Sequence, residues 1–380
     1  MLRSLIRSRL GTRLTLIALL AVGVTLLSAI SLPAAEFVPQ YVFTDLGVGV
    51  AYGVNDGRQV VGSVNTQAVV WGTGATAPTY LTSLGGTHSE AYAINADGQI
   101  VGYSQTVNDA ASHAVWWNGE GVPTDLRTLG GNNSSARDIN GSGQIVGYSY
   151  MADGTTFHAA LWAEDGARTD IGSSLGTNSS YSYGVSENGR MAGGTRPTWT
   201  SWGTAARWDS SGTITSLPQL AGAVHSSANA VNDSGQTVGY SVPVTMVHSA
   251  VLWDSAGGAT ALSTLGGQGA DAYDINNAGW VVGSAAASDG RAHACLWIGG
   301  TVFDLNSCLV TPAGSTLTGV RGINSVGDVV GSFTLGGQQH AFLLTLQNED
   351  PASVPEPSTL ALLSGGAMFG AGLLRRKRRI

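Results

Sequence analysis

One motif recurs seven times along this chain, and the repetition constrains the fold more than any other feature. The template is Ala-x-x-Ile-Asn-x-x-Gly-Gln-Val-Val-Gly-x-Ser, and it is clearest at residues 91–104 and 136–149. Its asparagine position falls at Asn55, Asn95, Asn140, Ser186, Asn232, Asn276 and Asn324. Spacings of 40 to 48 residues are typical of arrays built from one supersecondary unit. We therefore expect one repeat domain, although 380 residues would allow two or three domains.

Each unit is predicted to contain four short strands. In the third unit these are residues 135–140, 144–150, 157–163 and 168–173, which are rich in Val, Ile, Tyr and Trp. The sequence Asn140-Gly141-Ser142-Gly143 predicts a hairpin turn in which asparagine caps the first position and glycine takes a positive φ. The body of the chain shows no apolar pattern at helical spacing. Four antiparallel strands every 40–45 residues are typical of a β-propeller blade.

The two ends of the repeat array predict that the ring closes. Residues 41–47 resemble a fourth strand that precedes the first unit, and the seventh unit stops after its third strand at residues 341–346. The early strand can complete the last blade, which would remove two exposed sheet edges. We therefore expect an all-β, seven-bladed β-propeller over residues 36–349, in preference to an open solenoid.

Both ends of the chain are predicted to be targeting segments with short hydrophobic helices. Residues 1–35 have a basic start, an apolar run at 14–30 and a stretch of small residues, the layout of a secretory signal peptide. An uncleaved membrane helix is the alternative. At the other end, a linker at 350–358 precedes a transmembrane helix at 359–374 and a basic cytoplasmic tail at 375–380. Sixteen residues span about 24 Å as a helix, less than the ~30 Å of a bilayer core, which suits a temporary hold.

The C-terminal arrangement resembles the PEP-CTERM sorting signal of Gram-negative bacteria. The resemblance rests on Val354, Pro355, Glu356 and Pro357, the single apolar helix, and the cluster Arg375, Arg376, Lys377, Arg378 and Arg379. It implies that exosortase recognises the Pro-Glu-Pro motif and removes the tail during export across the inner membrane. The basic cluster would retain the tail until then, and the product would reach the cell surface or the medium. A plain membrane anchor is the alternative.

The repeats themselves resemble the HAF family of extracellular bacterial repeats. His340-Ala341-Phe342 carries the resemblance, with His-Ala-x-Leu-Trp versions at residues 113–117, 158–162 and 293–297. The first and fourth units depart most from the template, with Gln67 in place of the histidine and Ser186 in place of the asparagine. The resemblance implies an extracellular location, and it implies no biochemical activity.

Recurrence also decides how the chemically interesting side chains are interpreted. Five of the seven histidines share one repeat position, namely His113, His158, His248, His293 and His340. Six tryptophans share another, namely Trp71, Trp117, Trp162, Trp208, Trp253 and Trp297. Catalytic groups have unique neighbours, so we expect structural hydrogen bonds from the histidines and inter-blade packing from the tryptophans. No catalytic, cofactor-binding or metal-binding motif is present, and we predict neither an enzyme nor a cofactor.

Four further residues are candidates for specific roles. Trp199 and Trp202 lie in the long connection of the fourth unit and are candidates for stacking on sugar rings, unless that loop folds back on its blade. Cys295 and Cys308 are the only cysteines, and an exported protein permits a disulfide between them. Simple hairpin register does not place these two cysteines opposite each other.

Charge narrows the choice of partners. Residues 36–354 contain nine arginines, no lysine and 24 acidic residues, so this body carries a net charge of −15 and should repel nucleic acid.

The leading hypothesis is an exported surface or matrix protein that acts as a scaffold or binds extracellular polysaccharide, as in a biofilm matrix. The alternative is a carbohydrate-active enzyme with two carboxylates at the mouth of the central channel.

Overall fold

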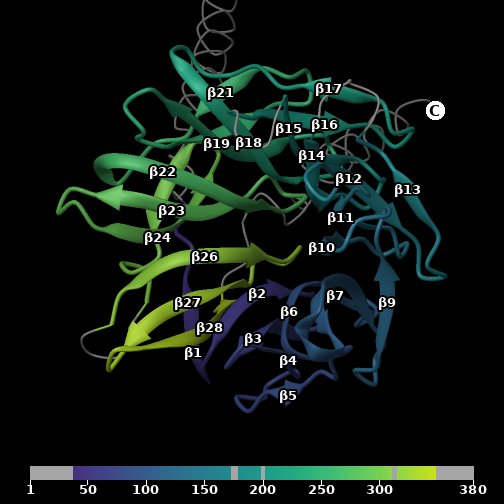
Figure 1. The fold of residues 1–380 in the computed structure, drawn as a ribbon. Helices are drawn as coiled ribbons and strands as arrows, with labels where there is room; N and C mark the ends of the chain where they lie inside the picture. Colours follow the sequence, from purple (N-terminus) through teal and green to yellow (C-terminus); the bar gives the residue numbers. More distant parts are fainter. Residues whose placement is uncertain (1–36, 173–178, 198–201, 310–314, 348–380) are drawn as a thin grey trace, which may run out of the picture. The chain divides into compact units, whose positions relative to one another are not determined.

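The computed structural model describes residues 37–172, 179–197, 202–309 and 315–347. Residues Gln40–Asn348 form one compact unit. In this unit seven four-stranded antiparallel sheets surround a common centre (Figure 1). The prediction of an all-β, seven-bladed propeller is therefore confirmed. No helix within the described residues is long and apolar enough to span a bilayer. The predicted terminal segments 1–35 and 350–380 lie outside the described residues.

Each blade consists of four strands, ordered from the innermost to the outermost. Blade 1 consists of β2 (Val50–Val54), β3 (Val60–Val64), β4 (Gln67–Trp71) and β5 (Thr79–Tyr80). Blade 2 consists of β6 (Gly85–Ile94), β7 (Ile100–Thr106), β8 (Ser112–Trp117) and β9 (Pro123–Arg127), with the short 3-10 helix η1 (Val107–Asp109) between β7 and β8. Blade 3 consists of β10 (Ser134–Ile139), β11 (Ile145–Tyr150), β12 (Phe157–Trp162) and β13 (Arg168–Asp170). Blade 4 consists of β14 (Ser179–Val185), β15 (Met191–Arg196), β16 (Thr204–Trp208) and β17 (Ile214–Ser216). Blade 5 consists of β18 (Ala223–Val231), β19 (Thr237–Pro243), β20 (Ser249–Trp253) and β21 (Ala259–Ala261). Blade 6 consists of β22 (Gly266–Ile275), β23 (Val281–Ala287), β24 (Ala292–Ile298) and β25 (Thr301–Asp304). Blade 7 is β26 (Leu317–Ile323), β27 (Val329–Leu335), β28 (Gln338–Leu346) and β1 (Tyr41–Val48).

The strand boundaries of the third blade lie close to the predicted ones, and the outermost strand differs most. This strand ends at Asp170, three residues before the predicted end. Ile171 still donates a backbone hydrogen bond to Ala159, but the next amide, of Gly172, donates to the Asp170 carboxylate at 2.9 Å. The aspartate therefore ends the strand by turning the chain away from the blade.

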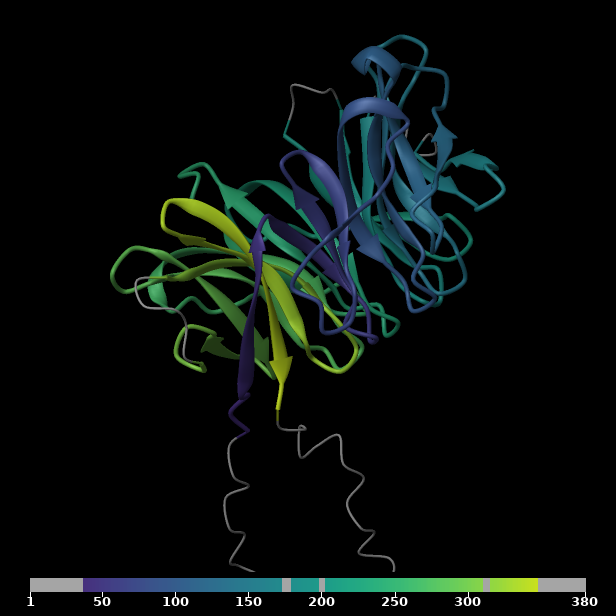
Figure 2. The ribbon, with the colours of Figure 1, turned by 90° about the horizontal axis from the view of Figure 1, so that it is seen from below.

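The last blade is assembled from both ends of the repeat array, as predicted. Strand β1 pairs antiparallel with β28, so that Tyr41 lies opposite Leu346. Figure 2 shows these two strands side by side at the edge of blade 7. A second contact joins blade 1 to blade 7, because Arg58 Nε lies 2.9 Å from the buried carboxylate of Asp328. The ring is therefore closed by hydrogen bonds and by an ion pair.

The hydrophobic core lies between neighbouring blades. The six repeat-equivalent tryptophans are at most 1% exposed, which confirms that they are packing residues. Trp71 Nε1 donates to the Leu46 carbonyl, and Trp117 Nε1 donates to the Thr82 carbonyl, in each case on the preceding blade. The indole nitrogen of Trp162 has no such partner among the described residues. Each tryptophan therefore fills an inter-blade gap, and most also bond across it.

The template asparagines join the blades in a continuous belt of hydrogen bonds. Asn140 Oδ1 accepts from the Gln144 amide at 3.0 Å, which is the predicted turn cap. Its Nδ2 donates to the Ser186 carbonyl of the next blade at 3.0 Å. Equivalent bonds run from Asn55, Asn95, Asn232, Asn276 and Asn324 to the blade that follows each of them. The cap was predicted from the sequence, whereas the inter-blade bond was not.

Ser186 is the one position where this belt changes. Its hydroxyl bonds within its own turn, to Asn188 and Arg190, and does not extend to blade 5. Asn188 Nδ2 donates instead to the Asp233 carbonyl at 2.8 Å. A residue two positions later therefore supplies the link between blades 4 and 5.

Each innermost strand carries a β-bulge at the same repeat position, and the template glycine permits it. In blade 3 the register shifts between Ala136 and Asp138, so that Arg137 has no partner on β11. The bulge brings the Ser135 carbonyl so close to Gly147 that a Cβ there would lie 2.0 Å from the oxygen. The seven equivalent glycines show the same contact at 1.8 to 2.3 Å. The glycine in the Val-Val-Gly segment is therefore required by the bulge.

Candidate ligand site at the centre of the ring

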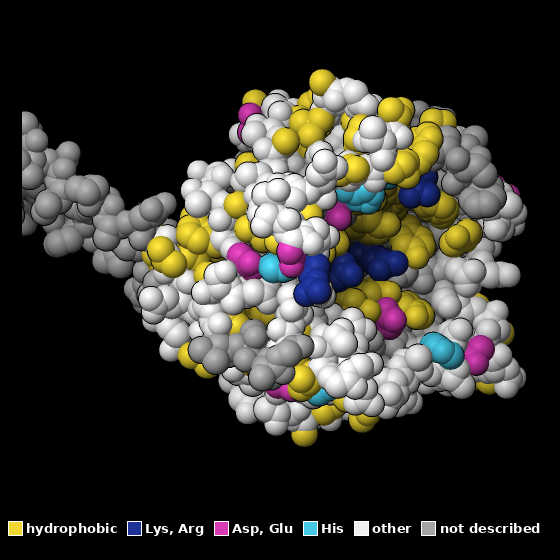
Figure 3. Space-filling view, turned by 90° about the vertical axis from the view of Figure 1, so that its left-hand side faces the viewer, with side chains coloured by type: hydrophobic (Ala, Val, Ile, Leu, Met, Phe, Trp, Pro, Cys, Tyr) yellow, Lys and Arg dark blue, Asp and Glu magenta, His cyan; other side chains and the backbone are white. Residues whose placement is uncertain are grey.

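The seven bulged residues line one cavity of about 280 Å³ at the centre of the propeller. A β-bulge commonly redirects a side chain toward a functional site. The bulged residues, in blade order, are Tyr52, Tyr92, Arg137, Tyr183, Asn229, Tyr273 and Arg321. Figure 3 shows a hollowed surface in which arginine and hydrophobic or aromatic side chains gather. The fold thus places four phenol rings, two guanidinium groups and one amide around a single space.

Arg137 is held in place by aromatic rings. Its guanidinium carbon lies 4.4 Å from the centre of the Tyr92 ring and 5.3 Å from that of Tyr148. Arg137 Nη2 donates to the Tyr148 hydroxyl at 3.2 Å. Its Nε is buried and has no hydrogen-bond partner among the described residues. Stacking on aromatic faces stabilises a guanidinium without neutralising its charge.

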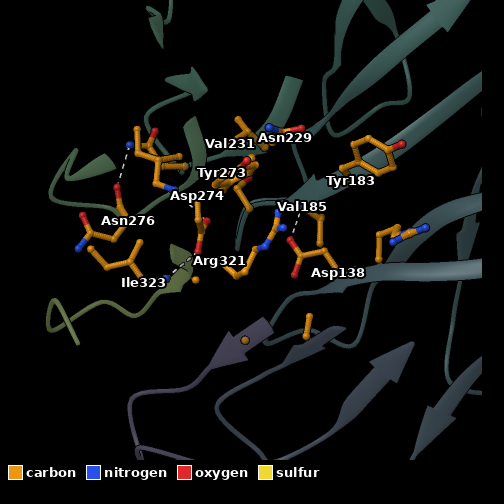
Figure 4. Close-up of a pocket in the computed structure, with 18 of the residues that line it drawn as sticks. Asp138, Tyr183, Val185, Asn229, Val231, Tyr273, Asp274, Asn276, Arg321 and Ile323 are labelled. Carbon is orange, nitrogen blue, oxygen red and sulfur yellow. Dashed lines mark hydrogen bonds between the residues drawn. The ribbon is translucent and has the colours of Figure 1, made fainter. Parts of the chain in front are cut away.

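Arg321 is the second guanidinium of the cavity, and it is exposed. It extends from β26 over the Tyr273 ring, with its guanidinium carbon 4.6 Å from the ring centre. Figure 4 shows its side chain pointing into the cavity near Tyr273 and Asp274. Among the described residues, neither Arg321 nor Arg137 forms an ion pair with a carboxylate.

Two aspartates line the same cavity, one residue beyond the bulge. Asp138 accepts from the Val185 amide of the next blade at 2.7 Å and from the Ile139 amide at 2.8 Å. Asp274 accepts in the same way from the amides of Ile323 and Ile275 (Figure 4). Both residues are partly buried, and desolvation raises the pKa of Asp138 to about 7 and that of Asp274 to about 6.

The repeat-equivalent histidines lie away from this cavity, and their predicted structural role is confirmed. In four blades the Nδ1 atom lies within hydrogen-bond distance of an aspartate on the outermost strand of the same blade: His113 with Asp125, His158 with Asp170, His293 with Asp304 and His340 with Asp45. His248 differs, because its aspartate is Asp271 on the next blade, at 2.8 Å. These pairs join strands and adjacent blades.

Of the two candidate sugar-stacking residues, the structure places one. Trp202 is 54% exposed, and its ring centre lies 5.8 Å from that of His225. His225 in turn lies 5.6 Å from Tyr240, which occupies in blade 5 the position that Tyr148 occupies in blade 3. Trp199 lies outside the described residues. The exposed indole of Trp202 therefore belongs to an aromatic cluster, and its predicted role in sugar stacking stays a prediction.

The two cysteines are free in the structure. Cys295 is buried on β24, opposite Gly283 on one side and Asp304 on the other. Cys308 lies in the turn beyond β25, where its Sγ is 3.4 Å from the Asp304 carbonyl oxygen. The structure therefore does not contain the candidate disulfide, and whether it forms in the exported protein stays a prediction to be tested.

The alternative hypothesis placed two carboxylates at the mouth of the central channel, but the bulged residues that line the central cavity were not identified from the sequence. The bulged position is the first variable residue of the template, and its mixture of Tyr, Arg and Asn resembles surface variation. The available signal was that this variable position follows alanine or serine in six of the seven units, and that an aspartate follows it in only two, as Asp138 and Asp274. In the described part of the chain, no group of three His, Cys, Asp or Glu side chains is arranged to hold a metal ion.

The predicted sorting residues Val354, Pro355, Glu356 and Pro357 lie outside the described residues, and the family comparison identifies their segment. Residues 353–379 match the PEP-CTERM protein-sorting motif. This motif indicates export, processing by exosortase and sorting to the cell surface. No curated protein matches the chain in sequence.

Solved structures support the fold alone. A catalytically inactive virginiamycin B lyase from Staphylococcus aureus, determined with quinupristin, superposes with a TM-score of 0.52 at 12% identity and covers 80% of this chain and 100% of its own. A streptogramin B lyase gives 0.50 at 12% identity over 81% of this chain and 98% of its own. A prolyl endopeptidase gives 0.52 at 11% identity over 80% of this chain and 51% of its own. The chain is therefore an exported β-propeller with a PEP-CTERM sorting signal.

Proposed function

We propose that this protein is an exported, non-enzymatic binding protein of the cell surface or extracellular matrix, and that it holds its ligand at the centre of the ring. The observation that carries this proposal is the ring of bulged residues, which gathers aromatic faces and cationic groups around one cavity. Binding sites commonly combine apolar walls with a few polar groups that fix orientation. A closed ring of inter-blade bonds gives such a site a rigid support.

The extracellular polysaccharide of a biofilm matrix is the proposed partner class. Aromatic rings stack on the apolar faces of sugars, and the cavity offers Tyr52, Tyr92, Tyr183 and Tyr273. Trp202 adds an exposed indole within an aromatic cluster of blades 4 and 5. The proposal includes the finer identity of the repeats as HAF repeats, an origin in a Gram-negative bacterium, and a transient hold in the inner membrane by residues 359–374 before the tail is removed.

The test combines a glycan array with a matrix assay. The purified exported protein should bind a subset of glycans, and the double variant Tyr92→Ala and Tyr273→Ala should lose that binding. The exposed Val326→Ala change is the matched control and should leave binding intact. A deletion strain should form an altered matrix. Absence of glycan binding together with an unchanged matrix would reject the proposal.

A carbohydrate-active enzyme is the second candidate, and one observation favours it. Asp138 and Asp274 both face the central cavity, and desolvation raises the pKa of each, as is common for a general acid. Both carboxylates, however, already accept two backbone hydrogen bonds, which fits a structural role equally well. Release of shorter sugars from a bound polysaccharide, lost in Asp138→Asn, would establish the enzyme.

A further inference from the structure

The central cavity contains cationic groups that the protein leaves without anionic partners. Among the described residues, the carboxylate ion pairs of arginine are Arg58 with Asp328 and Arg291 with Asp289, and both lie elsewhere. A guanidinium away from bulk water is costly unless a partner satisfies its N–H groups. Arg137 retains a buried Nε without a partner, and this atom belongs to a residue that lines the cavity.

Aromatic rings instead hold these groups in position. The rings of Tyr92, Tyr148 and Tyr183 lie 4.4, 5.3 and 5.7 Å from the guanidinium carbon of Arg137. Tyr273 supports Arg321 in the same way at 4.6 Å. A planar guanidinium that is fixed by stacking presents its edge for bidentate contact with a carboxylate or another oxyanion.

We propose that Arg137 and Arg321 form an anion-recognition site, and that the ligand of the central cavity is an acidic sugar, such as the uronate unit of a polysaccharide. This inference deepens the proposed binding function and depends on it. The sugar ring would stack on the tyrosines while its carboxylate bonds to a guanidinium. The cavity of about 280 Å³ is slightly smaller than the ~300 Å³ at which the usual range for ligand sites begins, which suits a short saccharide segment.

The other charged groups at the cavity are compatible with an anion. Asp138 and Asp274 have their carboxylate oxygens directed to backbone amides. Their raised pKa values reduce the negative charge near pH 6 to 7. Glu187 lines the edge of the cavity, and its carboxylate accepts from the Gly141 amide at 2.8 Å. In a body with a net charge of −15, the two guanidinium groups supply positive charge at the centre of the ring.

The experiment is titration calorimetry of the purified exported protein with three probes. These are an oligogalacturonate, a galactose oligomer of the same length, and sodium sulfate. The variants are Arg321→Gln, which removes an exposed charge, and Arg137→Lys, which keeps the charge but removes the planar fork. Arg291→Gln is the matched control, because Arg291 is an exposed arginine outside the cavity. Thermal melts of every variant establish that each is folded.

We expect the oligogalacturonate to bind at least tenfold more tightly than the neutral oligomer, to lose at least tenfold in affinity in Arg321→Gln, and to be unaffected by Arg291→Gln. Affinity should also fall as sodium chloride is raised. Equal binding of charged and neutral oligomers, unchanged in Arg321→Gln, would overturn the anion site and leave the proposed binding function standing. Failure of both oligomers to bind would overturn both proposals. Sulfate binding as tight as that of the uronate would overturn the assignment to a sugar.

Discussion

The side-chain amide of Asn324 donates a 3.1 Å hydrogen bond to the backbone oxygen of Asn55, which lies 269 residues earlier in the chain. This bond joins the last template asparagine to the first, so the belt of turn asparagines meets itself across the closure of the ring. The same two turns are also joined by Ser325, whose hydroxyl donates to Asp56 at 2.6 Å. The belt therefore holds the blades together near the centre, independently of the outer closure by β1.

The belt predicts different effects for two replacements at Asn140. Asn140→Asp keeps the oxygen that caps the turn but removes the donors to Gln144 and to the Ser186 carbonyl. Asn140→Ala removes the cap as well. We expect a loss in unfolding free energy of about 1–3 kcal/mol for alanine. The loss for aspartate at neutral pH should be at least as large, because its buried carboxylate would face the oxygens of Gln144 and Ser186. Urea denaturation measures both, and an unchanged unfolding free energy in Asn140→Asp would show that the donated bonds contribute nothing.

Closure of the ring predicts that β1 is essential for stability. Leu46 on β1 is 2% exposed, whereas Val42 on the same strand is 50% exposed. We expect Leu46→Ala to cost about 2–5 kcal/mol and Val42→Ala to change stability by less than about 0.5 kcal/mol. Deletion of residues 41–47 should lower the melting temperature sharply, because it uncovers the edge of β28. An unchanged melting temperature would contradict closure.

The bulges predict that glycines in one blade respond differently to the same change. A Cβ at Gly102 would lie 1.9 Å from the Glu90 carbonyl oxygen, whereas one at Gly119 would meet no atom within 4 Å. We expect Gly102→Ala to prevent folding or to lower the melting temperature strongly, and Gly119→Ala to be tolerated. Circular dichroism of the two variants gives the answer, and equal melting curves would disprove the steric requirement.

The raised pKa of Asp138 predicts a pH dependence of stability. The folded chain keeps the proton on Asp138 up to about pH 7, whereas the unfolded chain releases it near pH 4. The unfolding free energy contributed by this group is therefore present at low pH and falls as pH rises from about 4 to about 7. Asp138→Asn should remove that fall in denaturant titrations between pH 5 and 8.

Asp153→Asn is the control for this pH series. Hydrogen bonds from the Thr156 side chain and nearby amides lower the pKa of the exposed Asp153 to about 2. Its contribution is present above the unfolded pKa and is lost only below about pH 4. Between pH 5 and 8, the unfolding free energy of Asp153→Asn should therefore change with pH as that of the parent does. If Asp138→Asn also showed the parent's slope, the raised pKa of Asp138 would be contradicted.

The free cysteines predict distinct thiol reactivity. Burial raises the pKa of both thiols, and Cys295 is buried more completely than Cys308. Alkylation of the native exported protein should modify Cys308 slowly, while Cys295 should react only after unfolding. Non-reducing peptide mapping should recover both cysteines as separate peptides. Recovery of a cross-linked peptide would show that the bridge forms after all.

The sequence predicted the architecture because a repeat displays the same local physics seven times. Three features together indicate four-stranded blades and their closure. They are the turn of Asn140 and Gly143, the tryptophan at the end of six of the seven third strands, and the strand-like segment at 41–47 that precedes the first unit. The residues that line the central cavity could not be predicted in this way. A bulge depends on how two strands pair, and only the pairing reveals that Arg137 and Arg321 turn inward together with the tyrosines.

The closing pair of strands also decides how the molecule responds to mechanical load. The Gln347 amide donates to the Gln40 carbonyl at 2.9 Å, so the chain enters β1 and leaves β28 at the same end of an antiparallel pair. Tension applied to the two ends therefore breaks the pairing one residue at a time, beginning with Tyr41 and Leu346, and does not load all the bonds at once. Tension on one end and on a distant blade would instead load all the hydrogen bonds between β1 and β28 together. This propeller therefore resists pulling most weakly along the line between its own two ends.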